Sequence, residues 1–242
     1  MSTHSVPGTL ASGELVQELA TLYSNHYGVW SWNDSDIPRK RVKLSPARLR
    51  DWLIRDSKVA LAKCDGEVIG YAIVIQVRVK DYGIISWVTQ LVIHAEHRHL
   101  DVAKTLLFSI WGFSDHFAWG LITANPYAIR ALEKATRRRC SPERIARNKR
   151  KLKALGIEHT TYVKEDTVLE VTSGTSRINT TFFLDHSELP AMLSAAQASV
   201  PWVLGDLPEG WEWFAFTFQD QPSIELSTAE IDKMIKASDH KG

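Results

Sequence analysis

Residues 91–107 join an apolar stretch to a helical pattern through a basic loop. The apolar stretch ends at Ile93, and apolar residues at helical spacing begin at Val102. Positive or protonatable side chains lie between these points and just after them: His94, His97, Arg98, His99 and Lys104. A strand, a tight loop and a helix start direct backbone N–H groups and the positive helix end toward an anion. The segment therefore predicts a site for a phosphorylated cofactor.

A second helix start lies at Asn125 and Pro126. Asparagine is a strong N-cap, and proline is tolerated in the first helical turn. Ala131, Leu132 and Ala135 then recur at helical spacing, and residues 120–124 before the cap read as a short strand. We therefore expect a strand, a capped turn and a helix in this order.

Together these segments resemble the GNAT superfamily of acyl-CoA-dependent acyltransferases. The loop of that family carries Arg or Gln, then Gly after two further residues, and then Gly or Ala after one more. Arg98, Asp101 and Ala103 occupy these positions here, so two of the three match. Residues 125–134 resemble the second family motif, in which an asparagine opens the helix beside the pantetheine arm. The order of elements expected over residues 15–136 also agrees with the family.

The resemblance implies an N-acyltransferase with acetyl-CoA as its donor. The strands over residues 84–93 and 120–124 would splay apart and hold the pantetheine arm, with the following loop on the pyrophosphate. An unprotonated amine would attack the thioester carbonyl while one group removes the amine proton and another protonates the leaving thiolate. The residues implied in cofactor binding are Val92, Ile93, Arg98, His99, Leu100, Asp101, Val102, Ala103, Lys104 and Asn125.

Few residues at the positions that the family uses could transfer a proton. Leu132 stands where many family members carry the tyrosine that protonates the thiolate, which makes Tyr127 a displaced candidate, with a plain first-turn aromatic as the alternative. The strand over residues 84–93 contains no Asp or Glu, so the usual place of the general base offers only Thr89 and Gln90.

Asp101 stands where the family prefers glycine. A carboxylate beside a pyrophosphate costs free energy through charge repulsion. We therefore expect its side chain to point to solvent or to pair with Arg98 or Lys104.

An aromatic loop follows the first expected helix. Tyr27, Trp30 and Trp32 lie among polar residues and a proline, where the family builds the wall of its acceptor site. They are candidate substrate contacts, and the alternative is a hydrophobic lid that packs on the sheet.

A basic segment covers residues 137–153. It holds nine Lys or Arg residues and one acid, Glu143, so the rest of the chain carries 20 basic and 27 acidic residues. This segregation favours an anionic partner such as RNA, DNA or the 3′-phosphate of CoA, with a solvated helix face as the alternative. The candidate contacts are Arg144, Arg147, Arg150 and Lys151. A catalytically degenerate scaffold that binds nucleic acid or protein is accordingly the alternative to an enzyme.

The elements that position these residues can be read from periodicity. Ser12 and Ser45 cap two early helices, and three antiparallel strands follow from about residue 58 to residue 93. Beyond the basic helix, which we expect to stop at Gly156, the sequence predicts strands over residues 163–171, 178–184 and 211–218. Helices are predicted over residues 189–198 and 227–237. The fold class is α/β, with a mixed central sheet flanked by helices and an elaborated C-terminal part.

The amino-acid composition limits the class of protein and the number of domains. The 242 residues are 44% hydrophobic with a net charge of +1, which fits one globular domain over residues 1–242 with its core motifs at about residues 14–136. Cys64 and Cys140 are too few for a disulfide framework, and we expect no metal site. No signal peptide and no membrane-spanning stretch is recognisable, so we expect no membrane contact and a cytoplasmic location.

Overall fold

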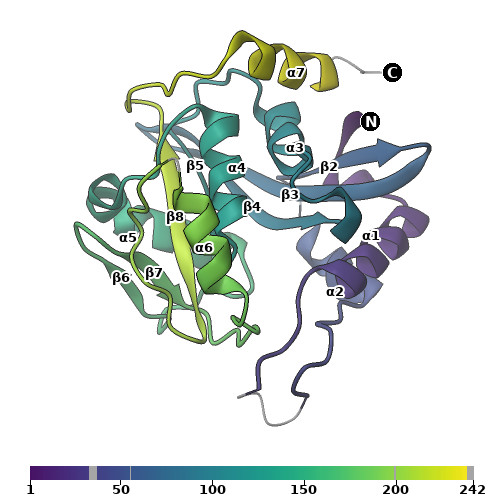
Figure 1. Cartoon of the computed structure of the whole chain (residues 1–242), viewed down its shortest axis with the longest axis horizontal. Helices are drawn as coiled ribbons and strands as arrows, with labels where there is room; N and C mark the ends of the chain where they lie inside the picture. Colours follow the sequence, from purple (N-terminus) through teal and green to yellow (C-terminus); the bar gives the residue numbers. More distant parts are fainter. Residues whose placement is uncertain (33–36, 55, 199, 239–242) are drawn as a thin grey trace.

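The computed structural model describes residues 1–32, 37–54, 56–198 and 200–238, built around one eight-stranded sheet (Figure 1). The strands lie in the order β1-β2-β3-β4-β5-β8-β7-β6, and every neighbouring pair is antiparallel except β4 and β5, which are parallel. The strands are β1 (Ser2–Pro7), β2 (Ser57–Cys64), β3 (Glu67–Val79), β4 (Gly83–Ile93), β5 (Ala118–Thr123), β6 (Leu169–Val171), β7 (Ser176–Asn179) and β8 (Trp211–Phe218). The predicted mixed sheet is confirmed.

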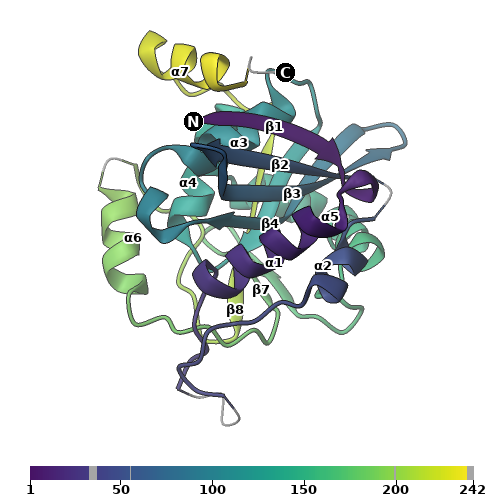
Figure 2. The same ribbon diagram turned by 90° about the vertical axis from the view of Figure 1, so that its right-hand side faces the viewer.

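Helices cover both faces of this sheet (Figures 1 and 2). Helices α1 and α2 lie on one face, where α1 contacts β3 and β4, and α3 and α4 lie on the other, where α3 contacts β2 and β3. The C-terminal helix α7 packs on α3 and β1. The helices are α1 (Gly13–His26), α2 (Pro46–Trp52), α3 (Val102–Trp111), α4 (Pro126–Thr136), α5 (Pro142–His159), α6 (Leu189–Gln197) and α7 (Thr228–Ser238).

The helix starts agree with the capping residues in the sequence. The hydroxyl of Ser12 accepts a hydrogen bond from Leu15 N, that of Ser45 from Arg48 N, and the side chain of Asn125 caps α4. Each side chain satisfies a backbone donor that the first helical turn leaves without a partner. The predicted helices over residues 189–198 and 227–237 are also present as α6 and α7.

Three details of the C-terminal prediction are wrong. Helix α5 continues through Gly156 to His159, because this glycine is a packing position: a Cβ atom there would lie 2.9 Å from the Trp87 ring. The strands expected over residues 163–171 and 178–184 are short, at Leu169–Val171 and Ser176–Asn179. Apolar residues outside them, such as Val163 and Leu184, pack from loops instead.

The N-terminal strand β1 is an addition to the predicted elements. Residues Ser2–Pro7 pair with β2 along their whole length and form the edge of the sheet. A polar edge strand lacks the apolar run of a central strand, so its alternation gives little signal in the sequence.

The parallel pair β4 and β5 is joined over a short stretch only. The pairing runs from Ile85↔Ala118 to Val88↔Leu121, and beyond it the two strands separate. The register between β3 and β4 shifts at the same level, where Ile73 pairs with Gln90 and Val74 with Val88, so Thr89 is the extra residue of a β-bulge. Bulges bend a strand and increase its local twist, which turns the end of β4 away from β5.

Aromatic rings pack against the part of β4 and β5 where the two strands are hydrogen-bonded. Trp87 of β4 meets Phe216 of β8 edge to face at 5.1 Å between ring centroids, and the Phe216 ring occupies the space above Gly120, where a Cβ atom would lie 2.1 Å from it. Only glycine fits that position. These packed rings lie next to the place where β4 and β5 separate.

Candidate functional site

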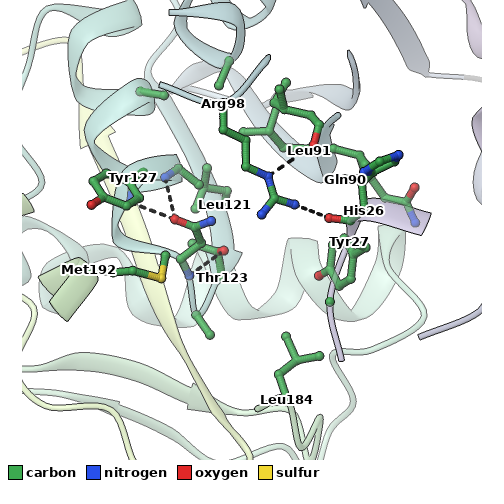
Figure 3. Close-up of a pocket in the computed structure, with 18 of the residues that line it drawn as sticks. His26, Tyr27, Gln90, Leu91, Arg98, Leu121, Thr123, Tyr127, Leu184 and Met192 are labelled. Carbon is green, nitrogen blue, oxygen red and sulfur yellow. Dashed lines mark hydrogen bonds between the residues drawn. The ribbon is translucent and has the colours of Figure 1, made fainter. Parts of the chain in front are cut away.

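A cavity of about 740 Å³ lies where β4 and β5 separate (Figure 3). Residues 88–93 of β4 and 121–123 of β5 line it, together with Ala124, the starts of α3 and α4, the segment after α1, residues 184–188 and the start of α6. Of the residues implied in cofactor binding, all except the exposed Leu100 line this cavity. Segments far apart in the sequence therefore meet around one opening in the sheet.

The end of β4 presents an unpaired backbone edge to this cavity. Val92 and Ile93 pair with Tyr71 and Gly70 of β3 on one side, and no described residue continues the pairing with β5 on the other. The carbonyl oxygen of Ile93 has a side-chain partner, Arg98, instead of a strand partner. Backbone N–H and C=O groups are obligatory hydrogen-bonding groups. The edge can therefore bind an extended ligand that carries amide groups.

Arg98 holds the loop after β4 in place. Its guanidinium donates hydrogen bonds to the carbonyl oxygens of His26 and of Ile93, the latter at 3.4 Å (Figure 3). Burial and the neighbouring Arg41 lower the pKa of Arg98, whereas Glu188 raises it. The arginine thus connects the end of α1 to the end of β4 at the rim of the cavity.

The same loop places Asp101 at the N-cap of α3. His99 and Asp101 both have left-handed backbone conformations, with φ of 61° and 64°, a region that glycine adopts most readily. The carboxylate of Asp101 lies 3.2 Å from Lys104 Nζ and 3.2 Å from Lys233 Nζ. The predicted pairing with Lys104 is confirmed, and Lys233 of α7 is an additional partner.

These ion pairs set the charge state of Asp101. Partial burial acts to raise the pKa of this carboxyl, but hydrogen bonds from Lys233 and Lys104 outweigh it, and the net pKa lies below the ordinary value. Lys104 itself is almost fully buried, and apart from Asp101 its ammonium has no partner within the described residues. A buried ammonium at the start of a helix is a strong attractor for an anion.

Asn125 and Tyr127 line the cavity at the start of α4, and Figure 3 shows the Tyr127 ring there. The side-chain oxygen of Asn125 accepts hydrogen bonds from Tyr127 N at 2.9 Å and Ala128 N at 3.4 Å. The Tyr127 ring meets the His99 ring edge to face at 4.6 Å. Tyr127 therefore bridges the starts of α3 and α4 and has its ring on the cavity wall.

Of the three aromatic residues expected at the acceptor wall, only Tyr27 lines the cavity. Its ring stacks on Tyr23 at 4.2 Å. Trp30 packs edge to face on Phe182 at 5.0 Å, as a lid on the body of the protein. Trp32 is exposed and carries the Arg39 guanidinium over its ring.

A buried acid on β8 adjoins this wall, and sequence reasoning missed it. Glu212 pairs with Ile178 of β7 in the sheet and interacts electrostatically with Tyr27, which lines the cavity. Glu212 is 6% exposed, accepts a hydrogen bond from the Thr180 hydroxyl at 2.8 Å, and forms no ion pair with any described residue. Burial raises its pKa from 4.5 to about 7, although the Thr180 hydrogen bond acts to lower it.

Glu212 interacts electrostatically with Tyr23, Tyr27 and Tyr162. Burial raises the pKa of Tyr27, and its neighbours Tyr23 and Glu212 raise it further. The Tyr71 hydroxyl donates to the side-chain oxygen of Gln90 at 2.7 Å, on the strand that lines the cavity. The cluster extends from the sheet to Tyr27. A lone Glu within the apolar run 211–218 is the signal in the sequence, but its neighbours cannot be read there.

The basic segment lies outside the cavity, and several of its cations have internal partners. Arg144 pairs with Asp220, Lys151 lies over the Tyr82 ring, and Arg139 pairs with the buried Glu133 at 2.9 Å. Arg147, Lys149 and Arg150 are exposed on α5, and within the described chain no acid pairs with them. The four predicted contacts thus divide into two engaged residues and two available ones, Arg147 and Arg150.

Neither a metal cluster nor a membrane span is found in the part of the chain that the structure covers. Within residues 1–32, 37–54, 56–198 and 200–238, no three His, Cys, Asp or Glu side chains are grouped as metal ligands. None of the helices there is both long and apolar enough to cross a bilayer.

The sequence matches no protein-family model and no curated protein. Solved structures do resemble the fold. An acetyltransferase of the GNAT family from Streptococcus pneumoniae is 10% identical, with 90% of this chain and 99% of that one covered and a TM-score of 0.41. The PaiA N-acetyltransferase from Thermoplasma acidophilum, in complex with coenzyme A, is 20% identical over 50% of this chain and 79% of that one, with a TM-score of 0.37.

A third solved structure aligns with a smaller share of this chain. The ribosomal-protein-alanine N-acetyltransferase from Brucella melitensis biovar Abortus 2308 is 17% identical over 46% of this chain and 69% of that one, with a TM-score of 0.33. All three are acetyltransferases. Because these likenesses are distant, the function proposed below rests on the geometry of the cavity.

Proposed function

We propose that the protein is an N-acyltransferase that takes an acetyl group from acetyl-CoA and transfers it to a primary amine. The observation that carries this proposal is the opening between the parallel strands β4 and β5, whose unpaired edge leads to the start of α3. An unpaired strand edge and a positively charged helix start suit the two chemical parts of coenzyme A, an arm with amide groups and a pyrophosphate.

The residues present fit this group in size and charge. The cavity of about 740 Å³ is large enough for a cofactor-sized ligand, and the buried ammonium of Lys104 lies on its wall. When bound, acetyl-CoA supplies a thioester-activated acetyl group. Residues 88–93 orient the arm, and Arg98 holds the loop that binds the phosphates.

Two groups are placed to handle protons. We assign proton removal from the acceptor amine to Glu212, because its pKa of about 7 lets it bind and release a proton near neutral pH. Tyr27, which lines the cavity and interacts electrostatically with this acid, stands between the acid and the acceptor. Tyr127 is the candidate donor to the leaving thiolate from the opposite wall.

Acetyl-CoA titration by calorimetry tests the proposal, because the enzyme and the degenerate scaffold differ at this step. We expect one binding site per chain, followed by release of the free thiol of CoA when a suitable amine is added. A polyamine, an aminoglycoside and a peptide with a free amino terminus are suitable first acceptors, since they differ in size and charge. Absence of acetyl-CoA binding would contradict the proposal.

We further propose a polyanion contact on α5, at a narrower surface than residues 137–153 as a whole. The observation in its favour is the exposed group of Arg147, Lys149 and Arg150, which has no acidic partner among the described residues. Cations left unpaired on one helix bind phosphates with release of counterions. RNA or DNA, single-stranded or double-stranded, is the partner class that this chemistry suits.

A further inference from the structure

The C-terminal helix α7 contacts the cavity wall at the start of α3 through a charged side chain. Lys233 Nζ lies 3.2 Å from the second carboxylate oxygen of Asp101, whose first oxygen lies 3.2 Å from Lys104 Nζ. One carboxylate thus holds two ammonium groups, one from α3 and one from α7, and the trio carries one net positive charge. The two lysines are 129 positions apart in the sequence and meet only in the fold.

Helix α7 is fixed on this side of the molecule by more than that ion pair. Met234 is fully buried in the main apolar core, and Glu230, one turn before Lys233, pairs with Lys134 of α4 at 3.5 Å. Figure 1 shows α7 lying across the end of the layer formed by α3 and α4. Lys134, Lys104 and Asp101 all line the cavity, so α7 contacts its rim at two points.

The positions of these charges indicate a ligand. Lys104 is 2% exposed, and apart from Asp101 its ammonium has no hydrogen-bonding partner in the described chain, although it lies on the wall of a large cavity. Asp101 alone would repel a phosphate at the start of α3. With a lysine on each side of it, the same position attracts one, and Lys233 is 58% exposed and accessible to a ligand.

We infer that Lys233 of α7 is a further cofactor-binding residue, which Asp101 holds in place to contact the pyrophosphate of coenzyme A together with Lys104. This inference rests on the proposed function. It also explains how a carboxylate stands at a phosphate-binding loop, since the charge that Asp101 introduces is offset by a residue from the C-terminal extension. The affinity of the site for phosphate then depends on the docking of α7.

The main experiment compares acetyl-CoA affinity in the wild type, Lys233→Gln and the matched control Lys236→Gln. Lys236 is exposed on the same helix. Because Lys233→Gln removes a charge-assisted hydrogen bond at a partly exposed site, we expect it to weaken binding by about threefold to tenfold at low salt, with a smaller difference at high salt. Lys236→Gln should bind like the wild type. Equal affinity in all three proteins would overturn the inference while leaving the proposed function intact; a wild type that binds no acetyl-CoA would instead refute the proposed function.

A second arm separates direct contact from an effect through Asp101. Asp101→Gly removes a negative charge and suits the left-handed backbone, so it should tighten binding by about threefold. Adding Lys233→Gln to Asp101→Gly should weaken binding again if Lys233 contacts the ligand. No change in the double variant would show that Lys233 acts only by holding Asp101, which would overturn the inference.

A third arm identifies the phosphate. Dephospho-CoA lacks the 3′-phosphate but keeps the pyrophosphate. The weakening caused by Lys233→Gln should be the same with this probe, because Asp101 lies in the loop at the start of α3. Loss of the effect with dephospho-CoA would contradict the assignment to the pyrophosphate. Circular dichroism and thermal unfolding of each variant check that the protein as a whole keeps its fold.

Discussion

The two walls of the cavity are built in different ways. The wall at the starts of α3 and α4 comes from two short segments, residues 97–104 and 121–134, and is rich in cations and backbone donors. The opposite wall combines the end of α1 and residues 184–186, and behind its Tyr27 ring lies the buried acid on β8. Binding a phosphate needs local backbone geometry, whereas tuning the pKa of an acid needs burial, which only distant segments can supply together.

The largest expected effect concerns the aromatic wall. Glu212→Gln keeps the shape of the side chain and its ability to accept from Thr180, but it cannot take up a proton. We expect acetyl transfer to fall by about 100-fold or more, since general-base catalysis contributes at least that much. Acetyl-CoA affinity should stay unchanged, because the cofactor wall is untouched.

The pH profile sharpens this test. In the wild type, transfer should rise with pH through about 7 as Glu212 loses its proton, and this rise should be missing in Glu212→Gln. Stopped assays of CoA release at several pH values measure both proteins. A variant that retains the wild-type rate would assign proton removal elsewhere and leave the two walls without distinct roles.

Glu212→Gln should lower acetyl transfer, but it should raise the stability of the folded protein at high pH. The pKa of Glu212 is raised from 4.5 to about 7 in the folded state, so folding stability is lost as the pH rises through this range. The loss amounts to about 3 kcal/mol above pH 7, at about 1.4 kcal/mol for each pH unit. Glu212→Gln should therefore be more stable than the wild type at pH 8 by up to that amount.

Urea unfolding at pH 5 and pH 8 measures this difference. At pH 5 the two proteins should be close in stability, because Glu212 is then protonated in the folded protein and partly protonated in the unfolded chain. A variant that is less stable than the wild type at pH 8 would show that the carboxylate has a favourable partner. The aromatic wall would then be no more than a packed, polar part of the core.

The cofactor wall should respond to Arg98→Ala. Loss of the hydrogen bonds to the carbonyl oxygens of His26 and Ile93 frees the loop, and we expect acetyl-CoA to bind about tenfold more weakly. Arg39→Ala is the matched control, because Arg39 stacks on Trp32 outside the cavity. Equal affinity in Arg98→Ala and the wild type would remove the loop from the site.

The smallest effect is expected outside both walls. Charge reversal at Arg147 and Arg150 should flatten the log–log salt dependence of RNA or DNA binding by about 0.7 to 0.9 for each phosphate that the helix no longer neutralises. Filter binding at several salt concentrations measures the slope. Acetyl-CoA affinity should not change, since α5 contributes no residue to the cavity. Absence of nucleic-acid binding by the wild type at low salt would leave this helix face as solvated surface.

The difference between the walls also explains what the sequence could predict. Arg98, Asp101 and Asn125 follow local rules of loops and helix caps, and these rules hold wherever the segment lies in the fold. Glu212 could not be predicted, because nothing in the run 211–218 reveals that Thr180 and Tyr27 will surround it. The same reason applies to Lys233, whose partner Asp101 is far away in the sequence.

Tertiary packing explains the remaining errors in what we predicted from the sequence. Gly156 resembles a helix stop because isolated glycines often end helices, whereas its role depends on the Trp87 ring across the sheet. Trp30 and Trp32 are neighbours of Tyr27 in the sequence, but the chain turns them toward Phe182 and Arg39. Of these three aromatic residues, only Tyr27, which directly follows α1, lines the cavity.

The unpaired edge of β4 has a consequence for the behaviour of the protein in concentrated solution. A free strand edge offers hydrogen bonds to any other extended chain, and exposed edges of this kind promote aggregation. Here residues 89–93 are recessed between the starts of α3 and α4 and the segments after α1 and before α6. These segments leave room for a single thin ligand and restrict the access of a strand that belongs to another sheet. The opening can therefore stay unpaired between rounds of binding without joining one molecule to the next.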